Sequence, residues 1–116
     1  MNYLQYIFDA VNTSSTADVF AIAAPQGITD DHIVIQIQSI DITENKDLEP
    51  QENINATLFL HFADADDAQA ELATIRDLIK TDVDYLTATL DGVQFFYDDL
   101  NQRILLAADF LFILKP

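Results

Sequence analysis

The residues from Ile54 to Lys80 constrain the fold most strongly, because a period-two apolar pattern runs directly into a helical one. Every second position of the first part is apolar: Ile54, Ala56, Leu58, Leu60 and Phe62. This alternation predicts a strand with one face in the core. From Asp64 onward apolar residues recur three and four apart, with acids in the first turn and Lys80 near the end, as in an amphipathic helix. The segment therefore predicts a strand followed at once by a helix.

The chain is strongly acidic, and its charge limits the partners that it can bind. Twenty Asp and Glu face five Lys and Arg, which gives a formal net charge of -15. Such a surface repels the phosphates of nucleic acids and of anionic membranes. We therefore expect no direct binding to DNA or RNA, although DNA can pass an acidic wall without adhering to it. Half of the residues are hydrophobic, so the acidity is not a sign of disorder.

Length and residue usage narrow the class further. The 116 residues predict a single domain over 1–116. The absence of cysteine excludes disulfides and thiolate metal sites within the chain. The first residues lack both the basic residues that precede the apolar stretch of a secretion signal and a signal-like cleavage site, and no apolar run is long enough for a membrane span. We expect a protein made and folded in the cytoplasm, with no membrane contact.

The remaining pattern predicts a mainly antiparallel sheet with two helices. Spacing predicts a short helix over 3–11, a short strand within 18–24, and a strand over 32–40. Residues 81–92 fit no single period and are interpreted as a loop, whereas 93–97 and 102–114 predict a C-terminal hairpin. The last strand is apolar on both sides, which indicates an interior position. We expect an α+β fold with a four-to-five-stranded sheet and two helices packed on one face.

Residues 41–53 separate two good strands with almost nothing to bury. The segment reads DITENKDLEPQEN, and thirteen residues are far more than a hairpin turn requires. They predict either a solvated surface loop or a projecting arm that orders against a neighbouring subunit. In the second case Glu44, Lys46, Leu48 and Glu49 are candidate contact residues.

The second face of the predicted sheet contains more apolar residues than a face that contacts only solvent usually does. Alternation assigns six apolar residues to it, and we expect them to form an exposed patch: Val34, Phe59, Phe96, Leu105, Leu111 and Ile113. Large apolar patches usually mark partner surfaces. The sequence thus predicts an oligomer or an obligate partner.

No catalytic or metal-binding constellation stands out. Asp64, Asp66 and Asp67 are spaced like oxygen ligands for Ca²⁺ or Mg²⁺, but Gln69 and Ile75 stand where a calcium loop requires Gly and Glu. Capping of the helix is the simpler interpretation. His32 and His61 lie at strand ends and could each pair with an acid for proton transfer. With neither a phosphate loop nor a nucleophile motif, we expect no enzyme, no cofactor and no bound metal.

Three segments carry a resemblance to a known family. They are HIVIQIQSI at 32–40, NATLFLHFADADDAQAELATIRDLIK at 55–80 and VQFFYDDLNQRILLAADFLFIL at 93–114. In this order, with a leading helix and a long hairpin loop, the chain resembles the tail terminator and tail-completion proteins of long-tailed bacteriophages. The resemblance is one of pattern, without an invariant motif, and it covers nearly the whole chain.

The resemblance implies a structural role in the virion. Such a protein would form a ring, usually a hexamer, that caps the tail tube, stops its growth and joins tail to head at the neck. Its partners would be the tail tube protein and the head connector protein, and DNA would pass through without specific binding. The ring would assemble in the host cytoplasm. The family has no catalytic residues to carry over.

Three other functions are compatible with the same residues. The first is another neck or connector ring protein, which would contact the portal side. The second is a small acidic inhibitor that mimics DNA and occupies a nucleic-acid-binding protein, which leaves the apolar second face unexplained. The third is an acid-base enzyme that uses His32 or His61, and it predicts a closed pocket.

Overall fold

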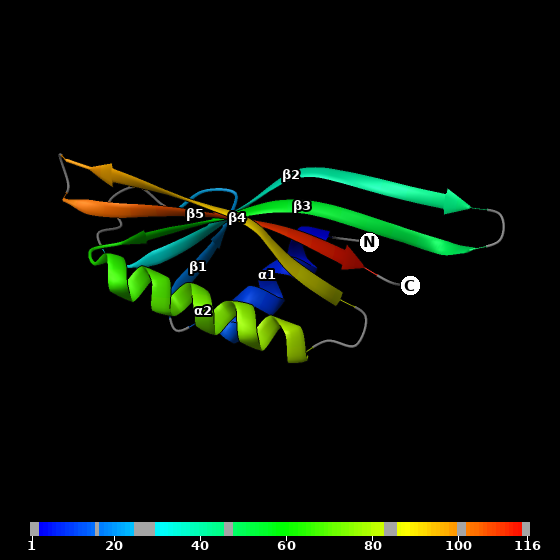
Figure 1. The fold of residues 1–116 in the computed structure, drawn as a ribbon, viewed down its shortest axis with the longest axis horizontal. Helices are drawn as coiled ribbons and strands as arrows, with labels where there is room; N and C mark the ends of the chain where they lie inside the picture. Colours follow the sequence, from blue (N-terminus) through cyan, green and yellow to red (C-terminus); the bar gives the residue numbers. More distant parts are fainter. Residues whose placement is uncertain are drawn as a thin grey trace.

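A computed structural model describes residues 3–15, 17–24, 30–45, 48–82, 86–99 and 102–114. The fold is α+β, with two helices and a five-stranded mixed sheet that is mostly antiparallel (Figure 1). In chain order the elements are α1 (Tyr3–Ser14), β1 (Asp18–Ala21), β2 (His32–Asn45), β3 (Leu48–Phe62), α2 (Ala65–Asp82), β4 (Leu86–Asp98) and β5 (Arg103–Leu114). The predicted fold class is confirmed at this level.

The strands lie in the order β1-β2-β3-β5-β4. β1 pairs with β2 in parallel, and the other neighbours are antiparallel. The predicted C-terminal hairpin is present as β4 and β5, and β5 lies between β3 and β4. The interior position predicted for the last strand is therefore correct, which explains why both of its sides are apolar.

One buried cluster joins both helices to alternate residues of the strands. It includes Ile7 and Val11 of α1, Leu72 and Ile75 of α2, and the strand residues Ile33, Ile35, Ile54, Leu58, Leu60, Leu106, Phe110 and Phe112. We call the sheet face that contributes these strand residues the core face, and the other face the opposite face. Because successive side chains of a strand alternate, His32, Phe59 and Leu105 lie on the opposite face.

The described residues of the segment 41–53 belong to two strands. β2 continues to Asn45 and β3 begins at Leu48, so the two strands form one long hairpin. The pairing holds although the segment has little to bury, because the ladder of backbone hydrogen bonds continues from Asn55 to Leu48 opposite residues 39–45. The predicted loop is therefore replaced by an arm of two paired strands, and the contact of this arm with a neighbouring subunit stays a prediction.

The hairpin contains an irregularity that the alternation did not reveal. Between Ile37 and Ser39 the register shifts, so Ser39 pairs with Asn55 and Ile40 with Ile54. Asn55 donates a hydrogen bond from Nδ2 to Ser39 Oγ at 2.9 Å. Simple alternation over 32–40 would place Ser39 on the face of Ile33, Ile35 and Ile37, but the extra residue reverses the side-chain alternation beyond it, so Ser39 lies on the other face.

The loop predicted for 81–92 is wrong for 81–82 and 86–92, whereas 83–85 lie outside the described residues. α2 extends to Asp82, and β4 begins at Leu86. A register shift between Leu90 and Gly92 accounts for the missing period. Before it Ala88 and Leu90 face the core, and after it Val93 lies on the same face opposite Ala108. A bulge moves the pattern from even to odd positions, so no single alternation covers the strand.

The start of α2 agrees with the capping interpretation. Asp64 precedes the helix, and its Oδ1 accepts hydrogen bonds from the backbone N–H of Asp66 at 2.7 Å and of Asp67 at 3.4 Å. Two amides that lack intrahelical partners are thereby satisfied. The Asp64, Asp66 and Asp67 cluster is a helix cap.

Candidate functional site

The two histidines meet on the opposite face of the sheet. His32 of β2 and His61 of β3 are directly opposite each other in the antiparallel ladder, where facing side chains come close together. Their rings stack in parallel, with centroids 4.5 Å apart and an interplanar angle of 6°. His32 is buried and His61 is half-buried. The sequence separated these residues by 29 positions, and only the hairpin register brings them together.

His32 is held by its own strand end and by a neighbouring aromatic ring. Its Nδ1 lies 2.9 Å from the backbone oxygen of Asp30. A carbonyl only accepts, so this nitrogen carries the proton and Nε2 is the acceptor in the neutral ring. Phe20 of β1 meets the imidazole edge-on, with centroids 6.0 Å apart. These contacts fix the orientation of the ring.

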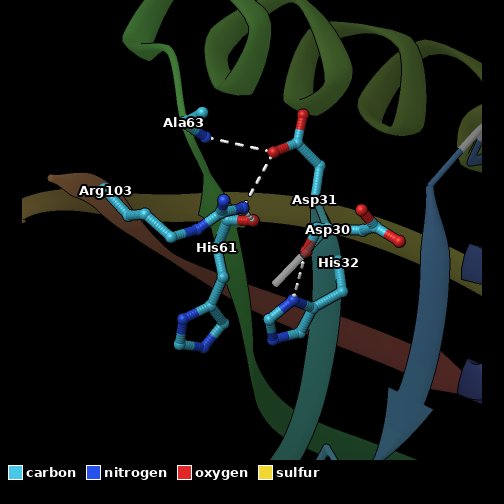
Figure 2. A network of polar contacts seen from close by, with 6 residues as sticks. All are labelled: Asp30, Asp31, His32, His61, Ala63 and Arg103. Atoms are coloured by element: carbon cyan, nitrogen blue, oxygen red, sulfur yellow. Dashed lines mark hydrogen bonds and ion pairs between the residues drawn. The ribbon is translucent and has the colours of Figure 1, made fainter. Parts of the chain in front are cut away.

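Beside the histidines, Arg103 joins three strand ends (Figure 2). Its guanidinium donates to Asp31 Oδ1 at 2.8 Å and to the backbone oxygen of His61 at 3.1 Å. The same carboxylate oxygen accepts the backbone N–H of Ala63 at 3.1 Å. The start of β2, the end of β3 and the start of β5 are thus tied by one network, which we call the Asp31–Arg103 network.

The surroundings of His61 disfavour its charged form. Burial, followed by the nearby His32 and Arg103, lowers the pKa of His61 below its usual 6.5. Desolvation and nearby positive charge both act against protonation of the His61 ring. His61 is therefore neutral at pH 7, and it offers one nitrogen donor and one nitrogen acceptor to the opposite face.

The histidine pair lines a shallow depression of about 390 Å³. Its other walls are mostly apolar, and the lining comprises Ile22, Ala23, Ala24, Val34, Gln36, Phe59 and Leu105 besides the two histidines. A mostly apolar concavity with a few polar groups is the usual form of a binding site. No local pattern in the sequence predicts this depression, because its walls come from β2, β3, β5 and the segment after β1.

The rim of this depression contains a strained residue. Ile22 has φ 73 and is 65% exposed, and Ala23 N–H donates to Ala21 O at 2.9 Å across it. This is a γ-turn of the strained, positive-φ type. The turn is anchored by Ile22 N–H to Ile35 O at 2.9 Å and by Gln36 Nε2 to Ile22 O at 3.3 Å. The fold thus holds an apolar side chain outward beside the depression.

Proton transfer by a histidine–carboxylate pair has no support in this geometry. Within the described ranges neither imidazole is hydrogen-bonded to a carboxylate, and Asp31 Oδ1 accepts its hydrogen bonds from Arg103 and Ala63. The depression is open, whereas the enzyme alternative predicted a closed pocket. Among the residues that the structure describes, no three His, Asp or Glu side chains gather as metal ligands.

The six apolar residues predicted for the second face do share it. Register places Val34 opposite Phe59 and Phe96 opposite Leu105, and Leu111 and Ile113 follow on the same face. Their exposure agrees with the prediction only in part: Phe96 is 51% exposed and Val34 only 6%, while the other four are half-buried. The expectation that Val34 lies in an exposed patch is therefore wrong, because β1, β3 and the segment after β1 surround it.

The predicted arm contacts lie at the end of the β2–β3 hairpin. Glu44 belongs to β2, and Leu48 and Glu49 belong to β3. Lys46 lies outside the described residues. The sequence reasoning missed three further exposed apolar residues, which are in β4: Val93, Phe95 and Tyr97. Their alternation was visible, but an edge position is decided only by the strand order.

No helix in the described part of the chain has the length and apolar character needed to cross a membrane. Comparison of the sequence with models of known protein families finds no match, and comparison with curated proteins finds no significantly similar sequence.

Proposed function

We propose that this protein is a structural subunit that assembles into a ring, as tail terminator proteins do, and that the ring caps a phage tail tube and joins it to the head. Both helices would cover the core face, and the opposite face and the hairpin arm would meet neighbouring subunits. The buried cluster that joins both helices to the strand residues of the core face supports this arrangement. The ring would be hexameric, and its site would be the neck of the virion.

The observation that carries the proposal is the β2–β3 hairpin. The last pair between β3 and β5 is Glu52 with Leu114, and beyond it β2 and β3 pair, among the described strands, only with each other down to Asn45 and Leu48. The hairpin extends past the rest of the molecule (Figure 1). With the hairpin included, the chain is elongated and measures 53 × 24 × 21 Å. A two-stranded ribbon is marginally stable by itself in water. A neighbouring subunit would supply the missing contacts.

The opposite face supports the same assembly. Phe59, Leu105, Leu111 and Ile113 give it a half-buried apolar surface, and the rim residue Ile22 extends it outward. Surfaces of this kind commonly become subunit interfaces. The net charge of -15 suits a channel through which DNA moves without binding.

The mass of the protein in solution tests the proposal. Light scattering over a range of concentration and salt should give an assembly several times the 13.0 kDa of one chain. High salt should favour assembly, because it screens repulsion between acidic subunits. A protein that stays at the mass of one chain under all these conditions contradicts the proposal.

A shortened variant identifies the arm as the cause. Residues 42–52 are replaced by Asn-Gly, a turn that joins paired strands, so that Asp41 and Asn53 remain opposite each other. Cooperative thermal unfolding shows that the body still folds. We expect this variant to remain monomeric, and a variant that still assembles would refute the role of the arm.

A further inference from the structure

Exposed apolar side chains concentrate in one short stretch of β4. Among the described residues, Val93 is 37% exposed, Phe95 53%, Phe96 51% and Tyr97 62%. Only two other large apolar side chains of the described residues are as exposed, Ile22 and Ile40. Three aromatic rings in a row on the surface are costly for an isolated chain.

These side chains flank a free backbone edge. β4 is the last strand of the sheet and pairs only with β5 among the described strands. Register places Val93, Phe95 and Tyr97 on the core face, opposite Ala108, Leu106 and Ile104, whereas Phe96 lies on the opposite face beside Leu105. Apolar side chains therefore stand on both sides of the unpaired edge.

Natural proteins usually protect such an edge. Short edge strands, lysines, prolines or covering loops prevent unwanted pairing. β4 has 13 residues, and the stretch from Val93 to Tyr97 contains no charge and no proline. The bulge at Gly92 lies at one end of this stretch and leaves the rest regular. An edge of this kind accepts an added strand, with backbone hydrogen bonds for affinity and side-chain contacts for selectivity.

Acidic residues at both ends of the stretch indicate the chemistry of the added strand. Asp91 precedes it, and Asp98 and Asp99 follow it; Asp91 and Asp99 are exposed. A second copy of this chain fits poorly, because the antiparallel register that matches 93–97 with itself also places Asp91 opposite Asp99 at both ends. Like charges directly opposite each other in a sheet are destabilising.

We propose that the β4 edge binds an extended segment of another protein, apolar in its centre and carrying Lys or Arg at its ends, as a sixth strand of the sheet. The net charge of -15 favours the same partner, since it attracts basic chains from a distance. This proposal rests on β4 and is independent of the β2–β3 arm. If the protein forms no ring, the proposal of strand addition at β4 is unaffected. If β4 binds no added strand, the proposal of a ring is likewise unaffected.

Two synthetic peptides test the proposal on the intact chain. Both have the centre Val-Thr-Val-Thr-Val; one has Arg at each end, and the matched peptide has Glu. Titration calorimetry should show about tenfold tighter binding of the Arg peptide at low salt, with the difference shrinking as salt rises. Amide hydrogen exchange in 93–97 should slow when the Arg peptide is bound. Binding of neither peptide, or equal binding of both, overturns the proposal.

Two surface variants separate the contributions of charge and apolar contact. Asp91→Asn with Asp99→Asn should remove most of the difference between the peptides, whereas Phe95→Thr with Tyr97→Thr should weaken both by several-fold. Thermal unfolding checks that each variant folds. Light scattering of the Phe95→Thr, Tyr97→Thr variant tests whether the edge binds a second copy of this chain instead. A loss of self-assembly in this variant would show that it does and would refute the proposal of a basic partner.

Discussion

The Asp31–Arg103 network lends itself to a quantitative test of how the histidine end of the sheet is held together. Arg103→Met removes the guanidinium but keeps an apolar stem, and Asp31→Asn removes the charge but keeps an oxygen for Ala63 N–H. The two single variants and the double variant form a double-mutant cycle with the wild-type chain. The cycle isolates the energy that couples the two charges.

The magnitude follows from the geometry and from the exposure of the pair. The contact is short, at 2.8 Å, and the side chains are 23% exposed for Arg103 and 40% for Asp31. Hydrogen bonds to charged groups contribute about 1.5–3 kcal/mol when buried, whereas fully exposed ion pairs contribute about 0–1 kcal/mol. This partly exposed pair should therefore couple by about 1 kcal/mol, equivalent to about 4 °C in Tm for a chain of this size.

Urea unfolding of the four proteins measures the coupling, and Arg76→Met on the exposed surface of α2 is the matched control. The control should change the free energy of unfolding by less than about 0.5 kcal/mol. NMR titration gives an independent check, since Arg103 is one cause of the lowered pKa of His61 and its loss should raise that pKa. A coupling energy below about 0.3 kcal/mol, or an unchanged His61 pKa, would refute the reasoning.

Three further predictions concern single residues. Because folding lowers the pKa of His61, the unfolded chain takes up the proton first as the pH falls below 6.5. The free energy of unfolding should therefore decrease from pH 6.5 down to the lowered pKa and stay level above pH 7. Thermal unfolding of wild type and His61→Gln against pH measures this, and equal slopes in the two proteins would contradict it. Gly92→Ala should stabilise the chain by about 0.4–1 kcal/mol in urea unfolding, because an added Cβ meets nothing within 4 Å and the unfolded chain loses freedom; a loss of stability would indicate that the bulge requires glycine. Ile22→Gly should raise the free energy of unfolding by about 0.5–1 kcal/mol, because it relieves a positive φ that costs about 1–3 kcal/mol and removes a mostly exposed side chain. A lower free energy of unfolding in the same assay would show that the side chain packs more firmly than its exposure indicates.

The sequence by itself determined the elements whose signal is local. The alternation in 54–62, the helical spacing from Ala65 to Ile75 and the cap at Asp64 each depend on neighbours within a few residues, and each is present in the structure. The same holds for the pairing of the last two strands and for the interior position of β5, because apolar residues on both sides of a strand require cover on both sides. Local periodicity also explains the assignment of Phe59, Leu105 and Leu111 to one face.

Tertiary structure decided everything that depends on register and strand order. The bulge at Gly92 concealed the strand from Leu86 to Leu90, and the hairpin from Asp41 to Asn53 forms through backbone pairing that side-chain patterns do not record. Strand order made β4 an edge and so exposed Phe95. The stacking of His32 on His61 and the ion pair between Asp31 and Arg103 join residues 29 and 72 positions apart. Such contacts are set by which strands become neighbours, a choice made by the packing of the whole chain.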